Sequence, residues 1–214
     1  MDLHQITDGL IQYLMLVGLL TFHEFGHAWT AMKCGDDTAR LQGRVSLNPL
    51  VHIDPIGTVL LPLLMIFLPF GVSRFMIGWA KPVPVNPHNL RNKNFDDLLV
   101  TMAGPGMNLI LAVGLMALAR GALAYHSEDA ASLFVRAASL SLLLCFFNLI
   151  PVPPLDGSHV LRVATGMSWE AYANFARYGF LIVIVLLQIP LVRETLRLAV
   201  NGTLNMLGTL FGVF

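Results

Sequence analysis

Residues 10–32, LIQYLMLVGLLTFHEFGHAWTAM, decide the fold class of this chain. A helix needs about 20 mostly apolar residues to cross the hydrocarbon core of a bilayer. Glu24 is the single charged residue of this stretch, which ends just before Lys33. We therefore predict a membrane-spanning helix that carries His23, Glu24 and His27 in its second half.

Further apolar stretches extend this prediction to the rest of the chain. Three of them are also long enough to span a bilayer: residues 98–119, 131–150 and 172–189. Residues 56–70 form a shorter stretch interrupted by prolines, and residues 191–214 either span the membrane or lie in its interface. We predict an all-α polytopic membrane protein with about five to six membrane segments, forming a single domain over residues 1–214.

The composition supports this class. Apolar residues make up 56% of the 214 residues and charged residues 12%, against about 25% charged in soluble domains. These values exclude a disordered chain and argue against a soluble one. Thirteen Lys and Arg balance thirteen Asp and Glu, so no nucleic-acid surface is expected. The two cysteines are too few for a disulfide scaffold or for a site with four cysteine ligands.

The basic residues predict the orientation. None precedes Lys33, whereas seven of the thirteen fall within residues 33–93. The positive-inside rule places that region in the cytoplasm and the N-terminus outside. Both loops around residues 56–70 are basic, so we expect this stretch to be re-entrant or a hairpin. The N-terminus lacks the basic start of a signal peptide, and we expect the first span to be retained.

Ionisable residues inside the first span point to a metal site. His23 and His27 are four residues apart and share one face of a helix. Two imidazoles at this spacing can hold one zinc ion, with the intervening Glu24 as a base. The same pattern in a soluble helix is often only a solvated face. Within a membrane span, however, such residues need partners, and a metal ion supplies them.

A zinc site needs a third protein ligand. Asp156 is the best candidate, because it follows an uncharged stretch and three prolines that break the helix. The alternative role for Asp156 is a helix N-cap. The rivals for the third position are His52, Asp54, Cys34 and His159. We expect His52 and Asp54 to support the ligands or to line the site instead.

Three motifs occur in a specific order: HEFGH at 23–27, AGPGMN at 103–108 and NLIPVPPLDG at 148–157. The small residues of the second motif predict close packing against the helix that carries the first. Together the motifs resemble the site-2 protease family of intramembrane zinc metalloproteases, over a three-helix core within residues 10–157. The intervening NPLVHIDPIGT and GWAKPVPVNP are similar to its compact bacterial branch, which has no PDZ or CBS domain.

The resemblance implies roles for individual residues. His23, His27 and Asp156 would bind one zinc ion per chain, and Glu24 would be the general base and acid. Asn148 would contact the substrate backbone or the developing oxyanion. The resemblance also implies a small membrane-embedded β element on the cytoplasmic side, within residues 42–85.

The implied activity is hydrolysis of peptide bonds in transmembrane segments, in regulated intramembrane proteolysis or in clearance of signal-peptide remnants. Expected partners are membrane-protein substrates and the lipid bilayer, in a bacterial cytoplasmic membrane, with the active site near the cytoplasmic side. Two alternatives stay open. One is an unrelated membrane metalloprotease with a glutamate as third ligand. The other is a catalytically inactive homologue that binds a membrane partner or a metal.

An unwound substrate needs partners for its backbone groups, and an edge strand supplies them without requiring a particular sequence. Residues 79–86 are the candidate edge, because Pro82 and Pro84 exclude a central strand. Val83 and Val85 keep their N–H groups and are the predicted substrate-binding residues. The alternatives are a loop that the prolines only stiffen, and substrate pairing along residues 42–47.

Overall fold

The computed structural model describes residues 3–67 and 78–214. The chain forms two compact units, Met1–Arg91 and Asn92–Phe214. Each unit is described by itself, and the single domain expected over residues 1–214 stays a prediction. The described residues of both units are helical or irregular, and none of them is in a β-strand.

Four helices are long and apolar enough to cross a membrane. They are α1 (Leu3–Lys33), α4 (Lys93–Ala124), α5 (Glu128–Asn148) and α7 (Trp169–Gln188). Each contains most of one predicted span, which confirms those four predictions. The helices begin three to seven residues before the predicted spans, since helical backbone continues past the apolar run into polar residues.

The first unit surrounds α1 with short elements: α2 (Thr38–Leu41), η1 (Pro49–Val51), η2 (Pro55–Leu60) and α3 (Leu61–Phe67). The side chain of Asp54 begins η2, a short π-helix, by accepting the N–H groups of Ile56 and Gly57. The predicted re-entrant stretch 56–70 is helical as far as Phe67. Residues 68–70 lie outside the described residues, so whether the stretch crosses fully or turns back stays a prediction.

The predicted β element is corrected by the structure. Within residues 42–67 and 78–85 the backbone forms turns, short helices and one extended segment, with no strand pairing. The extended segment, residues 78–86, donates its N–H groups to the carbonyls of Gly57 and His52 and to the side chains of Glu24 and Asp36. Pro82 and Pro84 remove donors that a ladder would need.

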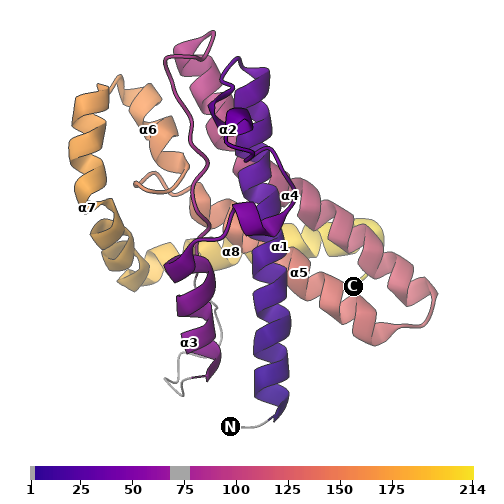
Figure 1. Ribbon diagram of the computed structural model, residues 1–214. Coiled ribbons are helices and arrows are strands. Elements are labelled where there is room, and N and C mark those ends of the chain that lie inside the picture. Colours follow the sequence, from indigo (N-terminus) through magenta and orange to yellow (C-terminus); the bar gives the residue numbers. More distant parts are fainter. Residues whose placement is uncertain (1–2, 68–77) are drawn as a thin grey trace. The chain divides into compact units, whose positions relative to one another are not determined.

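The second unit is built on the antiparallel pair α4 and α5, with α8 (Pro190–Phe211) packed against both (Figure 1). Their apolar core consists of six buried residues: Ala112, Met116, Ala138, Leu142, Val200 and Leu207. The short helix α6 (Gly157–Thr165) follows the proline-rich turn after α5. α8 is not among the four span candidates in the described part of the chain, so its place in the membrane or the interface stays open.

The AGPGMN motif lies in α4. Gly104, Pro105 and Asn108 are buried, and the hydroxyl of Ser141 in α5 donates to the Asn108 carbonyl at 2.7 Å. Within its own unit, the motif therefore brings α4 close to α5. Its packing against the helix that carries His23 and His27 stays a prediction.

Candidate metal centre and catalytic carboxylate

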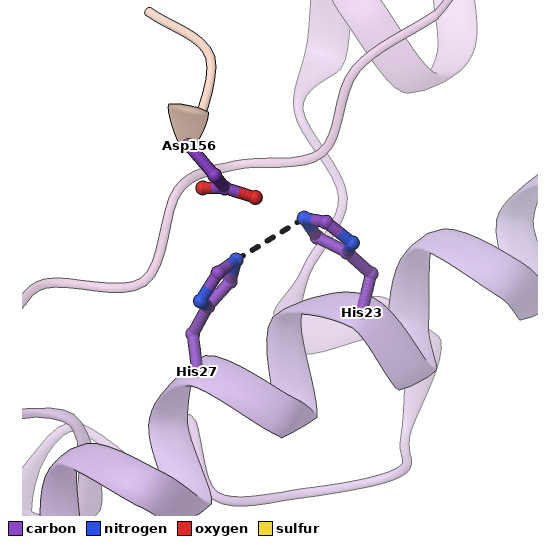
Figure 2. Close-up of side chains that lie close together, drawn as sticks. All are labelled: His23, His27 and Asp156. Atoms are coloured by element: carbon purple, nitrogen blue, oxygen red, sulfur yellow. Dashed lines mark hydrogen bonds between the residues drawn. The ribbon is translucent and has the colours of Figure 1, made fainter. Parts of the chain in front are cut away.

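His23 and His27 lie next to each other on α1 and could bind one metal ion. Their rings project from one face of the helix (Figure 2), and the two Nε2 atoms are 3.1 Å apart. Both side chains are buried. Two nitrogen ligands of one tetrahedral zinc ion, each about 2.0–2.1 Å from the metal, lie about 3.3 Å from each other. The observed separation therefore fits two ligands of a single ion.

Glu24 contacts the extended segment of residues 78–86. It is buried, and its Oε2 accepts the N–H of Val83 at 3.0 Å. This bond joins residues 59 positions apart. The carboxylate next to the first histidine is therefore held in place by the backbone of the segment predicted to bind substrate.

The extended segment is anchored along one of its two edges. Trp79 donates its N–H to Gly57 O at 3.2 Å, and its carbonyl accepts the Thr58 hydroxyl at 2.7 Å. Lys81 donates its N–H to His52 O at 2.9 Å. In extended backbone, successive residues present their polar groups to opposite edges. Residues 79, 81 and 83 therefore all bond along the same edge.

The opposite edge belongs to residues 80, 82 and 84. Pro82 and Pro84 have no N–H, so this edge is rich in carbonyl acceptors and poor in donors. From the sequence, Val83 and Val85 are expected to bind substrate because they keep their N–H groups. The structure shows that the Val83 donor is engaged by Glu24.

Arg44 also belongs to this region, although no sequence motif points to it. Its guanidinium is buried and donates through Nη2 to the carbonyl of Lys81. Burial lowers the pKa of Arg44, and the nearby negative charge of Glu24 acts in the opposite direction. Arg44 therefore holds the segment from the same edge as Glu24. The basic residues had been used only to predict orientation, and nothing in the sequence pairs Arg44 with Lys81.

His52 and Asp54 support the same segment from η1 and η2. The Nε2 of His52 lies 2.8 Å from Ser46 O, and the His52 carbonyl accepts the N–H of Lys81. Asp54 caps the helix that carries Thr58. The role of both residues in supporting the metal ligands or lining the site stays a prediction.

Asp36 anchors the far end of the segment. Its carboxylate accepts the N–H of Asn86 at 2.6 Å, the Nδ2 of Asn89 at 2.9 Å and the N–H of Thr38 at 3.1 Å. Burial raises the pKa of Asp36, but its hydrogen bonds outweigh this effect and hold the pKa below its usual value. The segment is thus fixed at both ends within the first unit.

Asp156 belongs to the second unit, just ahead of α6 (Figure 2). It occupies the N-cap position, yet its side chain makes no capping hydrogen bond. The next residue, Gly157, is required by close packing: a Cβ there would lie 2.2 Å from Leu149 O. The Asp-Gly pair thus marks the point where the turn folds back on the end of α5.

Asn148 ends α5, where its Nδ2 donates to Leu144 O at 2.9 Å. Its predicted contact with substrate stays a prediction. Of the rivals for the third ligand, His159 lies 3.2 Å from Asp97 through Nδ1. Cys34 is buried at the end of α1, where its carbonyl receives Arg91 N–H.

An apolar helix long enough to span a membrane, with a buried histidine pair and a neighbouring glutamate, is typical of a membrane-embedded metalloprotease. The sequence profile of Peptidase family M50 matches residues 11–125 and 114–189. The chain belongs to this family, that of the site-2 proteases, and is a metalloprotease.

Curated relatives agree with this assignment. The chain is 38% identical over 193 residues to "Putative zinc metalloprotease YwhC" of Bacillus subtilis, which covers 86% of this chain and 83% of that protein. It is 35% identical over 180 residues to "Putative zinc metalloprotease Rip2" of Mycolicibacterium smegmatis, covering 80% of this chain and 64% of the relative. The Rip2 protein of Mycobacterium tuberculosis strain Erdman is 34% identical over 147 residues, covering 67% and 52%.

The chain therefore spans most of YwhC but about half to two thirds of the Rip2 proteins. No solved structure matches it significantly. The names of the relatives imply zinc as the metal, in agreement with the donor chemistry of His23 and His27.

Proposed function

We propose that this protein is an intramembrane zinc endopeptidase that cleaves transmembrane segments of other membrane proteins. The observation that carries the proposal is the buried pair His23 and His27 with Glu24 between them, on a helix apolar enough to span the bilayer. A protease with its metal donors at this position meets substrates inside the membrane. Regulated release of a membrane-anchored factor and clearance of signal-peptide remnants are the two uses that fit this activity.

We further propose Asp156 as the third ligand of one zinc ion per chain. A carboxylate oxygen with two imidazoles is a donor set that suits catalytic zinc. The absence of a capping bond from the Asp156 side chain supports this role over the N-cap alternative.

Zinc, when bound, lowers the pKa of water and polarises the scissile carbonyl. Glu24 would accept the proton of the attacking water and return it to the leaving amine. The bond from Val83 N–H fixes the carboxylate for this task. Asn148 would donate its side-chain amide to the developing oxyanion, exchanging its present bond with Leu144.

We propose that the substrate strand pairs with the extended segment 79–86. The opposite edge offers carbonyls, so the substrate would donate its N–H groups there. Val83 and Val85 remain the proposed substrate-binding residues of this segment, with Val83 N–H keeping its bond to the carboxylate of Glu24. The basic residues of this region support a site near the cytoplasmic face.

The test is cleavage of a transmembrane reporter by the full chain in proteoliposomes, comparing the wild type with Glu24→Gln. This change keeps shape and hydrogen bonding but removes the base. We expect cleavage to fall by about 10²–10⁴-fold, with zinc content and folding retained. Substantial cleavage by Glu24→Gln would refute the catalytic role. Cleavage only outside the transmembrane segment of the reporter would refute the intramembrane activity.

A further inference from the structure

A second group of polar and aromatic residues lies in the unit that carries Asp156, and Asp97, Ser158 and Arg162 of this group are buried. We call it the Asp97 cluster; its members come from α4, α6 and α7: Asp97, Ser158, His159, Arg162, Trp169 and Tyr172. The proposed chemistry uses none of them. An ionisable group buried in a membrane protein is costly, so this cluster calls for an explanation.

Asp97 is the centre of the cluster. Its side chain is 3% exposed and accepts a hydrogen bond from Arg162 Nη2 at 2.9 Å. The Nδ1 of His159 lies 3.2 Å from its other oxygen. Both partners are on α6, so a single carboxylate near the start of α4 holds this helix at two points, one turn apart.

Residues of α7 also contact α6, through an aromatic ring and a hydroxyl group. The Arg162 guanidinium lies over the Trp169 ring, 4.1 Å from its centroid. The hydroxyls of Ser158 and Tyr172 are 2.8 Å apart, and Ser158 also donates to Leu155 O at 2.6 Å. Side chains of both α4 and α7 therefore contact α6.

We infer that the Asp97 cluster positions Asp156 for metal binding by fixing α6 to α4 and α7. This inference rests on the proposed role of Asp156 as a zinc ligand. Asp156 directly precedes α6, and its carbonyl accepts the N–H of His159 in the first turn. Because Asp156 is the N-cap residue of α6, the position of α6 sets where its carboxylate begins.

Two physical considerations favour positioning over stability as the purpose of the cluster. A buried ion pair contributes little net stability, because desolvation offsets most of the attraction between the charges. The hydrogen bonds of the pair are directional, however, and so favour one orientation of α6 relative to α4. α6 has nine residues, too few to be stable alone, so its direction must come from outside contacts.

The test measures zinc affinity of the detergent-solubilised full chain by chelator competition, with the absorption spectrum of the Co²⁺-loaded protein as a second readout. The variants are Asp97→Asn and the paired change Asp97→Leu with Arg162→Met. The paired change removes both charges at once and so leaves no uncompensated buried charge. Glu194→Gln is the matched control, because it breaks an exposed ion pair with Arg197 in the same unit. Asp156→Ala provides the reference for loss of the ligand.

We expect about a tenfold or greater loss of zinc affinity in both Asp97 variants, the range seen when groups that orient metal ligands are removed. The Co²⁺ spectrum should change, and the control should match the wild type. Wild-type affinity in the folded paired variant, with reduced affinity in Asp156→Ala, would overturn the positioning inference alone. Unchanged affinity in Asp156→Ala would instead refute the ligand assignment. Failure of both Asp97 variants to fold would also overturn the inference, because the cluster would then serve folding.

Discussion

The two units supply the proposed zinc ligands in different ways. In the first unit, helical periodicity alone brings His23 and His27 together, and their Nε2 atoms meet at 3.1 Å. In the second unit, Asp156 follows a turn in which Gly157 packs on the carbonyl of Leu149, and its helix is held by Asp97. The position of the histidine pair depends on local helical backbone, whereas the position of Asp156 depends on contacts between residues far apart in the sequence. Substitutions remote from the ligands should therefore disturb Asp156 more than the histidine pair.

The largest effect should come from removing one donor of the helical pair. His27→Ala leaves a single imidazole on α1, so we expect most of the bound zinc to be lost and cleavage to fall to background. Metal analysis of the purified protein and the reporter assay measure both quantities. His88→Ala, on an exposed loop, is the control. Full zinc content in His27→Ala would show that the metal is bound elsewhere.

Adding a single methyl group next to Asp156 should disturb the position of this proposed ligand without replacing a ligand. Gly157→Ala would place a Cβ 2.2 Å from Leu149 O, so the turn must shift. Overpacking of this kind costs about 1–3 kcal/mol, and we expect a lower melting temperature together with weaker zinc binding. Gly121→Ala in α4 is the matched control, since a Cβ there has no neighbour within 4 Å. Equal melting temperatures and equal zinc binding in the two variants would contradict the proposed dependence of Asp156 on remote packing.

A substitution that does not contact Glu24 directly should still weaken the hydrogen bond that holds its carboxylate. Arg44→Met removes the donor to the Lys81 carbonyl, which loosens the segment whose Val83 amide fixes Glu24. We expect cleavage to fall by roughly 10–100-fold, since small misplacements of a catalytic group have effects of this order. Zinc content should not change. Arg40→Met, which breaks an exposed ion pair with Asp37, should leave cleavage unchanged. A loss of zinc in Arg44→Met would show that Arg44 acts on the metal site instead.

The smallest effect concerns pH. The pKa of Asp36 is lowered in the folded protein, so the unfolded chain binds its proton more readily. The stabilisation is fully present above the unfolded pKa of about 3.9 and is lost as the pH falls through the lower folded value. We expect the melting temperature of the wild type to decrease in this acidic range. It should decrease less in Asp36→Asn, and parallel curves for the two proteins would contradict this contribution.

The sequence predicted those parts of the protein that depend on local pattern. Four spans follow from apolar length, and the donor pair follows from the i, i+4 spacing. The β element was predicted wrongly, because Pro82 and Pro84 indicated an extended segment but could not show what it pairs with. The partners of this segment include two backbone carbonyls and the side chains of Arg44, Glu24 and Asp36, up to 59 residues away.

The support of α6 was also beyond local reasoning. Asp97 and Arg162 are 65 residues apart in the sequence. Asp97 lies just before a predicted span, where an acidic residue is common and does not indicate a buried contact. His159 was considered only as a rival for the third zinc ligand. Contacts of this kind arise only when separate helices pack, and no periodicity in one segment records them.

The most direct test of the central claim is the coordination of zinc in the full-length protein, measured by X-ray absorption at the zinc edge. We predict one zinc per chain with two imidazole nitrogens and one carboxylate oxygen from the protein. Asp156→Ala should lose the carboxylate, and His27→Ala should lose one imidazole. A sulfur ligand, or a wild-type spectrum in Asp156→Ala, would contradict the proposed centre.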